Sequence, residues 1–218
     1  MKKTTRTCFL LVLALALQLV MMPAASTAAS EPSRIINVVY DDSGSMYMGA
    51  NMMWSQAKYA AEVFAAMLGT NDSMNLYLMS DFLASPSIRT PRLQLNGRSG
   101  ADANVKAVHD MVTTRASNTP FGVVELAYND LLAKTADEKW LVILTDGDFN
   151  QMSKAQENAF FESKSQDVRV YYLAMGDDLT LGIRQDEDND MFFAHAVDGN
   201  DVLENAQSPL YQREESIR

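Results

Sequence analysis

Short apolar runs alternate with helical segments along most of the 218 residues, and this alternation is the feature that most constrains the fold. The runs that read as buried strands are residues 35–40, 74–82, 140–144, 168–174 and 191–196. Apolar side chains recur at helical spacing in residues 52–68, 101–113, 121–134 and 152–164. This order predicts an α/β fold, a doubly wound and mostly parallel sheet of about six strands with helices on both faces. Pro91 makes residues 88–95 suitable for an edge strand, and we expect one antiparallel edge strand.

The first 29 residues have the pattern of a secretory signal peptide. A basic start is followed by an apolar run over residues 8–22 and by a small-residue stretch that favours cleavage near Ala28 or Ala29. An uncleaved membrane anchor is the alternative, because the run approaches the ~18 residues that a membrane span needs. We therefore expect a signal peptide over 1–29, a domain over 33–209 and a polar tail over 210–218.

The expected mature chain is acidic and has no cysteine. Cleavage removes three of the 18 basic residues and none of the 28 acidic ones, so the net charge falls from −10 to −13. This charge disfavours nucleic acid and anionic membrane surfaces as partners. Because Cys8 is the single cysteine and leaves with the leader, no disulfide can form within the mature chain. Export without disulfides favours a secreted or cell-surface bacterial protein, with no membrane insertion of the mature chain evident.

Hard oxygen ligands follow two of the predicted strands. Asp41, Ser43 and Ser45 alternate in a loop after residues 35–40, and Asp146 follows residues 140–144. Between them, Thr119 and Pro120 are placed as the cap and first-turn proline of the helix at 121–134. Ligands of such sheets bind beyond the carboxyl ends of the strands. Carboxylate and hydroxyl oxygens suit Mg²⁺, with Mn²⁺ or Ca²⁺ as alternatives, and Gly44 would let the loop curl tightly.

Asp-x-Ser-x-Ser after a first strand resembles the metal-ion-dependent adhesion site of von Willebrand factor A (VWA) domains, with matching Thr and Asp at Thr119 and Asp146. The resemblance implies that Asp41, Ser43, Ser45 and Thr119 bind the ion directly or through water, and that Asp146 often binds through water. It further implies that a protein partner fills the open position with an acidic side chain, and that Asp42 points away.

The resemblance favours an extracytoplasmic, metal-dependent protein-binding module for adhesion or assembly, and not an enzyme. One alternative is a Mg²⁺-dependent phosphoryl-transfer hydrolase with Asp41 as nucleophile, although Ser43 stands where such enzymes carry a second Asp. No Gly-x-Ser-x-Gly elbow is present to favour a hydrolase of another class. A further alternative is a structural subunit of a surface assembly, in which the ion only stabilises the fold.

Several other residues have plainer interpretations. Asp41–Ser45 is also compatible with a polar turn that caps the next helix, and residues 146–148 with a plain turn. The acidic residues 186–190 are expected to form a solvated loop more readily than a second ion site. His109 and His195 are expected to be structural or surface residues. The cluster Met46, Met48, Met52 and Met53 is equally compatible with an apolar rim for a partner and with packing beneath the loop.

Overall fold

The computed structural model describes residues 33–48, 53–85, 89–147, 149–150, 152–175, 186–196 and 198–204, with the side chain of Glu187 excepted. All of these belong to the compact unit Glu31–Arg218. The expected signal peptide and polar tail lie outside the described residues. Among the helices that the structure describes, none combines the length and hydrophobicity needed to cross a membrane.

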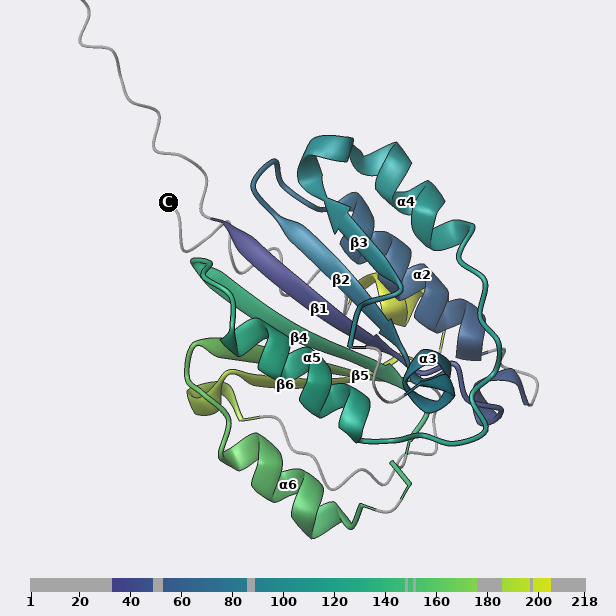
Figure 1. Cartoon of the computed structure of the whole chain (residues 1–218), viewed down its shortest axis with the longest axis vertical. Coiled ribbons are helices and arrows are strands. Elements are labelled where there is room, and N and C mark those ends of the chain that lie inside the picture. Colours follow the sequence, from purple (N-terminus) through teal and green to yellow (C-terminus); the bar gives the residue numbers. More distant parts are fainter. Residues whose placement is uncertain are drawn as a thin grey trace, which may run out of the picture. The chain divides into compact units, whose positions relative to one another are not determined.

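The described residues form a mostly parallel sheet with helices (Figure 1). Its strands are β1 (Arg34–Tyr40), β2 (Ser73–Leu78), β3 (Leu93–Asn96), β4 (Glu138–Thr145), β5 (Val168–Met175) and β6 (Met191–Ala196). The helices are α2 (Met53–Ala66), α3 (Met79–Ala84), α4 (Ala101–His109), α5 (Gly122–Leu132) and α6 (Lys154–Glu162). Short 3₁₀ helices lie at η1 (Ser45–Tyr47), η2 (Gly97–Ser99) and η3 (Glu187–Asn189). The predicted α/β fold class is confirmed.

The order of the strands creates a switch point beside β1. The six strands lie in the order β3-β2-β1-β4-β5-β6, and every pair is parallel except β2–β3. The chain therefore proceeds outward from β1 to one edge of the sheet and then returns to β4 on the other side of β1. The carboxyl ends of β1 and β4 diverge into separate connections, and this is where doubly wound sheets bind ligands.

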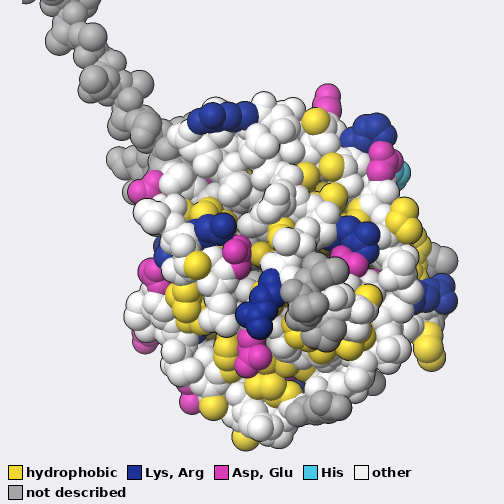
Figure 2. All heavy atoms as spheres, in the orientation of Figure 1, with side chains coloured by type: hydrophobic (Ala, Val, Ile, Leu, Met, Phe, Trp, Pro, Cys, Tyr) yellow, Lys and Arg dark blue, Asp and Glu magenta, His cyan; other side chains and the backbone are white. Residues whose placement is uncertain are grey.

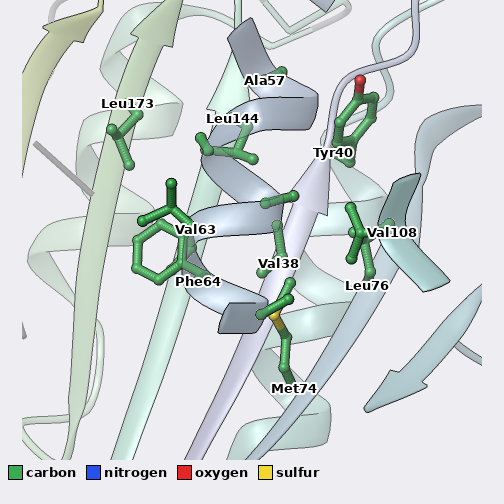
Figure 3. Close-up of a cluster of buried hydrophobic side chains, with 14 of the residues drawn as sticks. Val38, Tyr40, Ala57, Val63, Phe64, Met74, Leu76, Val108, Leu144 and Leu173 are labelled. Carbon is green, nitrogen blue, oxygen red and sulfur yellow. The ribbon is translucent and has the colours of Figure 1, made fainter. Parts of the chain in front are cut away.

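Two apolar layers cover the sheet, one on each face. Ala57 and Phe64 of α2 and Val108 of α4 pack with one set of strand side chains (Figure 3). Val124 of α5 and Phe161 of α6 pack with the alternating set on the other face. Because strand side chains alternate between faces, central strands buried on both sides appear in the sequence as unbroken apolar runs.

The structure corrects the predicted strand at residues 74–82. The strand ends at Leu78, and residues from Met79 form the short helix α3. The register explains the change, because Tyr40↔Leu78 is the last pair between β2 and β1. Beyond that level β1 offers no further backbone partner, and the remaining apolar residues satisfy their backbone groups within a helix.

Candidate metal centre

Asp41 is the first residue after β1 and is fully buried at the switch point. Its backbone amide still donates to the carbonyl of Leu144, at 2.9 Å. Its Oδ1 accepts from the backbone amide of Ser43 at 2.8 Å, and its Oδ2 accepts from Oγ1 of Thr145 at 2.6 Å. The carboxylate is thus fixed by its own loop and by the end of β4, but none of the ion pairs among the described residues includes it.

Burial makes a negative charge on Asp41 costly. Desolvation, with a smaller contribution from the nearby charge of Asp146, raises the pKa of this carboxyl to about 6 against the lowering effect of the hydrogen bonds from Ser43 and Thr145. A buried carboxylate beside a second carboxylate is stabilised by a cation, which supplies the charge that the protein lacks there. The electrostatics of Asp41 therefore fit a bound cation.

The hydroxyls of Ser43 and Ser45 lie beside one another, with 3.0 Å between the two Oγ atoms. Ser43 is buried and Ser45 is exposed, so the loop rises from the interior to the surface within a few residues. Gly44 does not have the role expected of it. Its φ of −60° and ψ of −34° are ordinary helical values, and an added Cβ would meet no atom within 4 Å. Other residues could adopt this conformation, so the loop does not depend on glycine to curl.

Asp42 faces a different side of the loop from Asp41. It is fully buried, and its Oδ1 accepts from the backbone amide of Ser80 in the first turn of α3, at 2.9 Å. Burial raises the pKa of this carboxyl, with the hydrogen bonds from Ser80 opposing the shift. Asp42 therefore ties the loop to α3, in agreement with the expectation that it points away from the ion.

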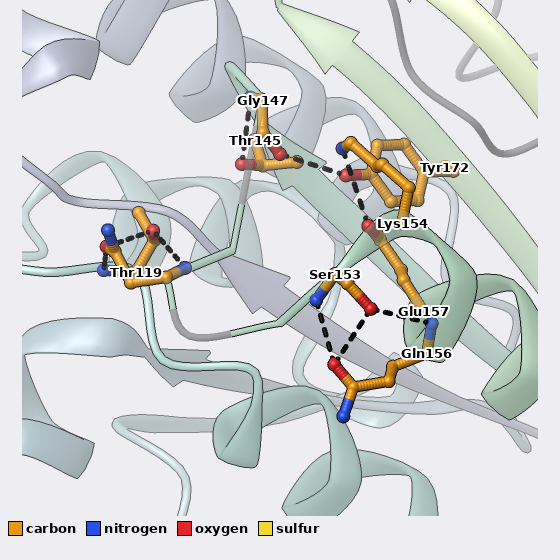
Figure 4. Close-up of polar contacts among 9 residues, drawn as sticks. Thr119, Thr145, Gly147, Ser153, Lys154, Gln156, Glu157 and Tyr172 are labelled. Atoms are coloured by element: carbon orange, nitrogen blue, oxygen red, sulfur yellow. Dashed lines mark hydrogen bonds and ion pairs between the residues drawn. The ribbon is translucent and has the colours of Figure 1, made fainter.

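Asp146 and Thr145 stand at the carboxyl end of β4, next to β1 in the sheet. Asp146 is partly exposed, and its charge acts on Asp41 as described above. The fully buried Thr145 donates to Asp41 and accepts from the amide of Gly147, at 3.3 Å, while the hydroxyl of Tyr172 donates to the carbonyl of Gly147, also at 3.3 Å (Figure 4). Thr145 was not among the predicted site residues. Its place directly before Asp146 at the end of a strand beside β1 was the available signal.

Thr119 lies before α5 and not at its cap position. The cap position of α5 is Phe121 and no side chain caps it, so the expected capping by Thr119 is wrong. Instead, Pro120 pairs with Asn150 in a parallel bridge. The Thr119 hydroxyl donates to Oδ1 of Asn150 at 2.6 Å and accepts from the Asn150 amide at 3.2 Å (Figure 4). These two bonds fix the Thr119 hydroxyl against Asn150.

The structure thus brings Asp41, Ser43, Ser45 and Asp146 together and attaches the segment of Thr119 beside them. That attachment runs through Ala116, whose amide donates to the carbonyl of Asp42 at 2.7 Å and whose carbonyl accepts from the amide of Gly44 at 3.2 Å. In the described ranges, no three His, Cys, Asp or Glu side chains gather as a metal cluster. A cation at this place would depend on hydroxyl oxygens together with the two carboxylates.

The remaining predicted residues divide between core and surface. Met46 is fully buried and packs beneath the loop, whereas Met48 is 69% exposed and available as part of an apolar rim. Met52 lies outside the described residues. His109 and His195 are exposed. Within residues 186–190, Glu187–Asn189 form η3 and Asp186 pairs with Met191 in an antiparallel bridge. Oδ1 of Asp190 approaches Nε of Arg169 at 3.4 Å.

The sequence matches no protein-family model and no curated protein. Solved structures do resemble it. They include a von Willebrand factor type A protein from Catenulispora acidiphila, with 19% identity, 83% of this chain and 42% of that one covered, and a TM-score of 0.57. The D319A mutant of the PilB minor pilin from Streptococcus sanguinis has 13% identity, 88% and 64% coverage, and a TM-score of 0.61.

Another similar structure is proximal thread matrix protein 1 from the mussel byssus, whose metal-ion-dependent adhesion site (MIDAS) motif is occupied by zinc. It has 15% identity, covers 81% of this chain and 47% of its own, and gives a TM-score of 0.54. The chain spans 42–64% of the length of these three proteins. Likeness at 13–19% identity establishes a shared fold, and function has to be argued from the site itself.

Proposed function

Because this chain has the fold of a VWA domain, we propose that it is an exported, metal-dependent protein-binding module for adhesion or assembly. Asp41, Ser43, Ser45 and Thr119 hold a divalent cation directly or through water, and Asp146 holds it through water. Mg²⁺ is the ion that we favour, with Mn²⁺ or Ca²⁺ as alternatives. The ion leaves a coordination position open, and an acidic side chain of a protein partner fills it.

The observation that carries this proposal is the buried Asp41 carboxylate. It lies at the switch point with hydrogen-bond donors on both oxygens, has no ion-pair partner within the described residues, and has neighbouring hydroxyls at Ser43 and Ser45. With Asp146 held through water, Asp41 is the single carboxylate of the proposed set that can touch the divalent ion directly, and the hydroxyl ligands add no charge. The bound ion therefore retains affinity for a further anionic ligand.

The exposure of the site supports capture of a partner. Asp41 is at the bottom, and Ser45 and the partly exposed Asp146 lie towards solvent. A carboxylate from outside can therefore reach an ion held here without unfolding of the loop. The similar pilin and byssus proteins belong to surface or extracellular assemblies by their names, which is consistent with the proposed role.

The test measures ion binding and partner capture separately. Calorimetry with MgCl₂ should give one site in the wild type and none in Asp41→Ala. The matched control is Asp188→Ala, which removes an exposed acid from residues 186–190. This variant should bind one ion as the wild type does, and loss of that ion would place the site at residues 186–190 instead.

Partner capture is then measured with native cell-envelope extract, with Mg²⁺ and with chelator. The proposal expects a protein that is retained by the wild type in Mg²⁺ and released by chelator, and that Asp41→Ala does not retain. Capture that persists in chelator contradicts the proposal. Ion binding with a raised melting temperature but no captured protein supports the structural-subunit alternative. Phosphatase turnover in Mg²⁺ that disappears in Asp41→Ala would favour the hydrolase.

A further inference from the structure

A second recognition element lies next to the candidate metal centre, on the connection between α4 and α5. Residues 111–116 of this connection are attached to the loop that carries Ser43 and Ser45. The hydroxyls of Tyr47 and Thr113 are hydrogen-bonded, and Ala116 is bonded through its backbone to both Asp42 and Gly44. The connection therefore holds a fixed position beside the site.

Arg115 is presented from this connection in an unusual conformation. Its φ of +56° lies in the left-handed region, which residues with a side chain seldom adopt. Its guanidinium carbon lies 4.5 Å from the ring centroid of Tyr47, and Tyr47 in turn stacks on Trp54 with 5.7 Å between centroids. The exposed side chain of Arg115 is thus held on an aromatic support.

The stacked guanidinium is available to a ligand. None of the ion pairs in the described part of the chain includes Arg115, although the chain as a whole carries a net charge of −10. Stacking uses the flat face of a guanidinium and leaves N–H groups at its edge, which can bind a carboxylate through two parallel hydrogen bonds.

Two exposed apolar residues lie next to the Tyr47–Thr113 contact in the sequence. Met48 is 69% exposed and follows Tyr47, and Val112 is 72% exposed and precedes Thr113, so each is adjacent in sequence to the Tyr47–Thr113 contact. We call Arg115, Tyr47, Met48 and Val112 the rim surface. Figure 2 shows hydrophobic side chains beside Lys or Arg side chains along the edge of the molecule where Figure 1 places the α4–α5 connection.

We propose that the rim surface binds a second acidic side chain of the same partner. This inference rests on the proposed function, and it specifies the partner as a protein segment with two carboxylates and an apolar residue. One carboxylate binds the ion, the other binds the edge of the Arg115 guanidinium, and the apolar residue packs on Met48 or Val112. Charge complementarity selects this occupant, because the rim surface offers an unpaired cation in an acidic chain.

A displayed library of random peptides tests the proposal without knowledge of the natural partner. The full chain selects peptides in Mg²⁺, chelator releases them, and the released pool is sequenced. The same selection is made with Arg115→Asn, with Arg115→Glu and with Asp41→Ala. Asparagine tolerates the left-handed conformation, so Arg115→Asn removes the charge with little added strain. Melting temperatures confirm that each variant is folded.

The wild-type pool should contain two acidic positions at a constant separation. Arg115→Asn should retain one of them, and Arg115→Glu should replace the second with Lys or Arg. A synthetic peptide from the wild-type pool should bind about ten-fold or more weakly to Arg115→Asn, the effect expected from loss of a charged hydrogen-bonded pair. A wild-type pool with one acidic position, unchanged in the Arg115 variants, contradicts the inference but leaves the proposed function intact. A wild-type pool without chelator-released peptides contradicts both.

Discussion

At the scale of single residues, the Asp41 carboxylate combines two opposing demands. Its burial disfavours the charge, as the pKa raised to about 6 indicates, while the hydrogen bonds from Ser43 and Thr145 favour the charge. Without an ion, the native state holds a proton on Asp41 between about pH 4 and pH 6 that the unfolded state has lost. The contribution of Asp41 to stability therefore falls as pH rises through this window and stays unfavourable above it.

This balance predicts that Asp41→Asn is more stable than the ion-free wild type at pH 7.5. Asparagine keeps an acceptor for the amide of Ser43 and removes the buried charge, so the melting temperature in chelator should rise by a few degrees. The stabilisation that Mg²⁺ gives the wild type should be absent from the variant. Gly44→Ala serves as a control in the same loop and should keep the wild-type response. A lower melting temperature of Asp41→Asn in chelator would show that the charge itself stabilises the loop.

Thr145 orients Asp41 from the end of β4, and its removal should weaken ion binding. Thr145→Val keeps the shape of a fully buried side chain and deletes the donor to Oδ2 of Asp41. Supporting hydrogen bonds of this kind typically contribute 10–100-fold to metal affinity, so calorimetry with MgCl₂ should show a loss of roughly ten-fold. Unchanged affinity in a folded Thr145→Val would mean that the loop alone orients the carboxylate.

At the scale of elements, a close approach of two turns joins the beginning of β2 to the end of β3. The amide of Gly97 donates to the carbonyl of Asp72 at 3.0 Å, and a Cβ on Gly97 would lie 1.7 Å from the carbonyl oxygen of Gly69. A contact this short with backbone cannot be relieved by rotation of a side chain. Gly97 therefore permits the antiparallel edge strand to pack where it does.

Gly97→Ala should destabilise the protein by about 2 kcal/mol or more, because the turn containing Gly69 has to move. Chemical denaturation measures this loss as a lower midpoint with little change in slope. Gly199→Ala is the matched control, since an added Cβ there meets no atom within 4 Å. Equal midpoints for Gly97→Ala and the wild type would contradict the close approach.

Sequence patterns predicted elements well where burial determines the pattern. The doubly buried strand over residues 140–144 has no other simple interpretation, and it is part of β4. The sequence pattern did not predict where an element ends when that boundary depends on contacts with another segment of the chain. The strand predicted over residues 74–82 ends at Leu78 because its partner β1 ends at the same level. Thr119 does not cap α5 because the neighbouring Pro120 pairs with Asn150. Both outcomes depend on tertiary partners that local sequence does not encode.

At the scale of the whole molecule, the candidate site joins three distant parts of the chain. The resemblance to VWA domains predicted that Asp41 and Asp146 share one site, and the strand order places them at the ends of the neighbouring strands β1 and β4. The left-handed Arg115 and the Asn150 contact of Thr119 were not predicted, since each follows from how irregular segments pack on the finished sheet. A ligand shared by such segments couples them, because it binds only when all are in place.

Ion binding should therefore protect the three segments together. Hydrogen exchange followed by mass spectrometry, with Mg²⁺ and with chelator, should show slower exchange in residues 41–48, 116–120 and 145–147. Binding of the ion to the native state alone adds stability at every part of the site. Asp41→Ala should show no difference between the two conditions. The turn at residues 69–73 lies at the start of β2, at the opposite end of the sheet from the carboxyl ends of β1 and β4, and serves as the internal reference. Protection confined to residues 41–48 would remove Thr119 and Asp146 from the site, because an ion that they bind would slow exchange in their segments as well.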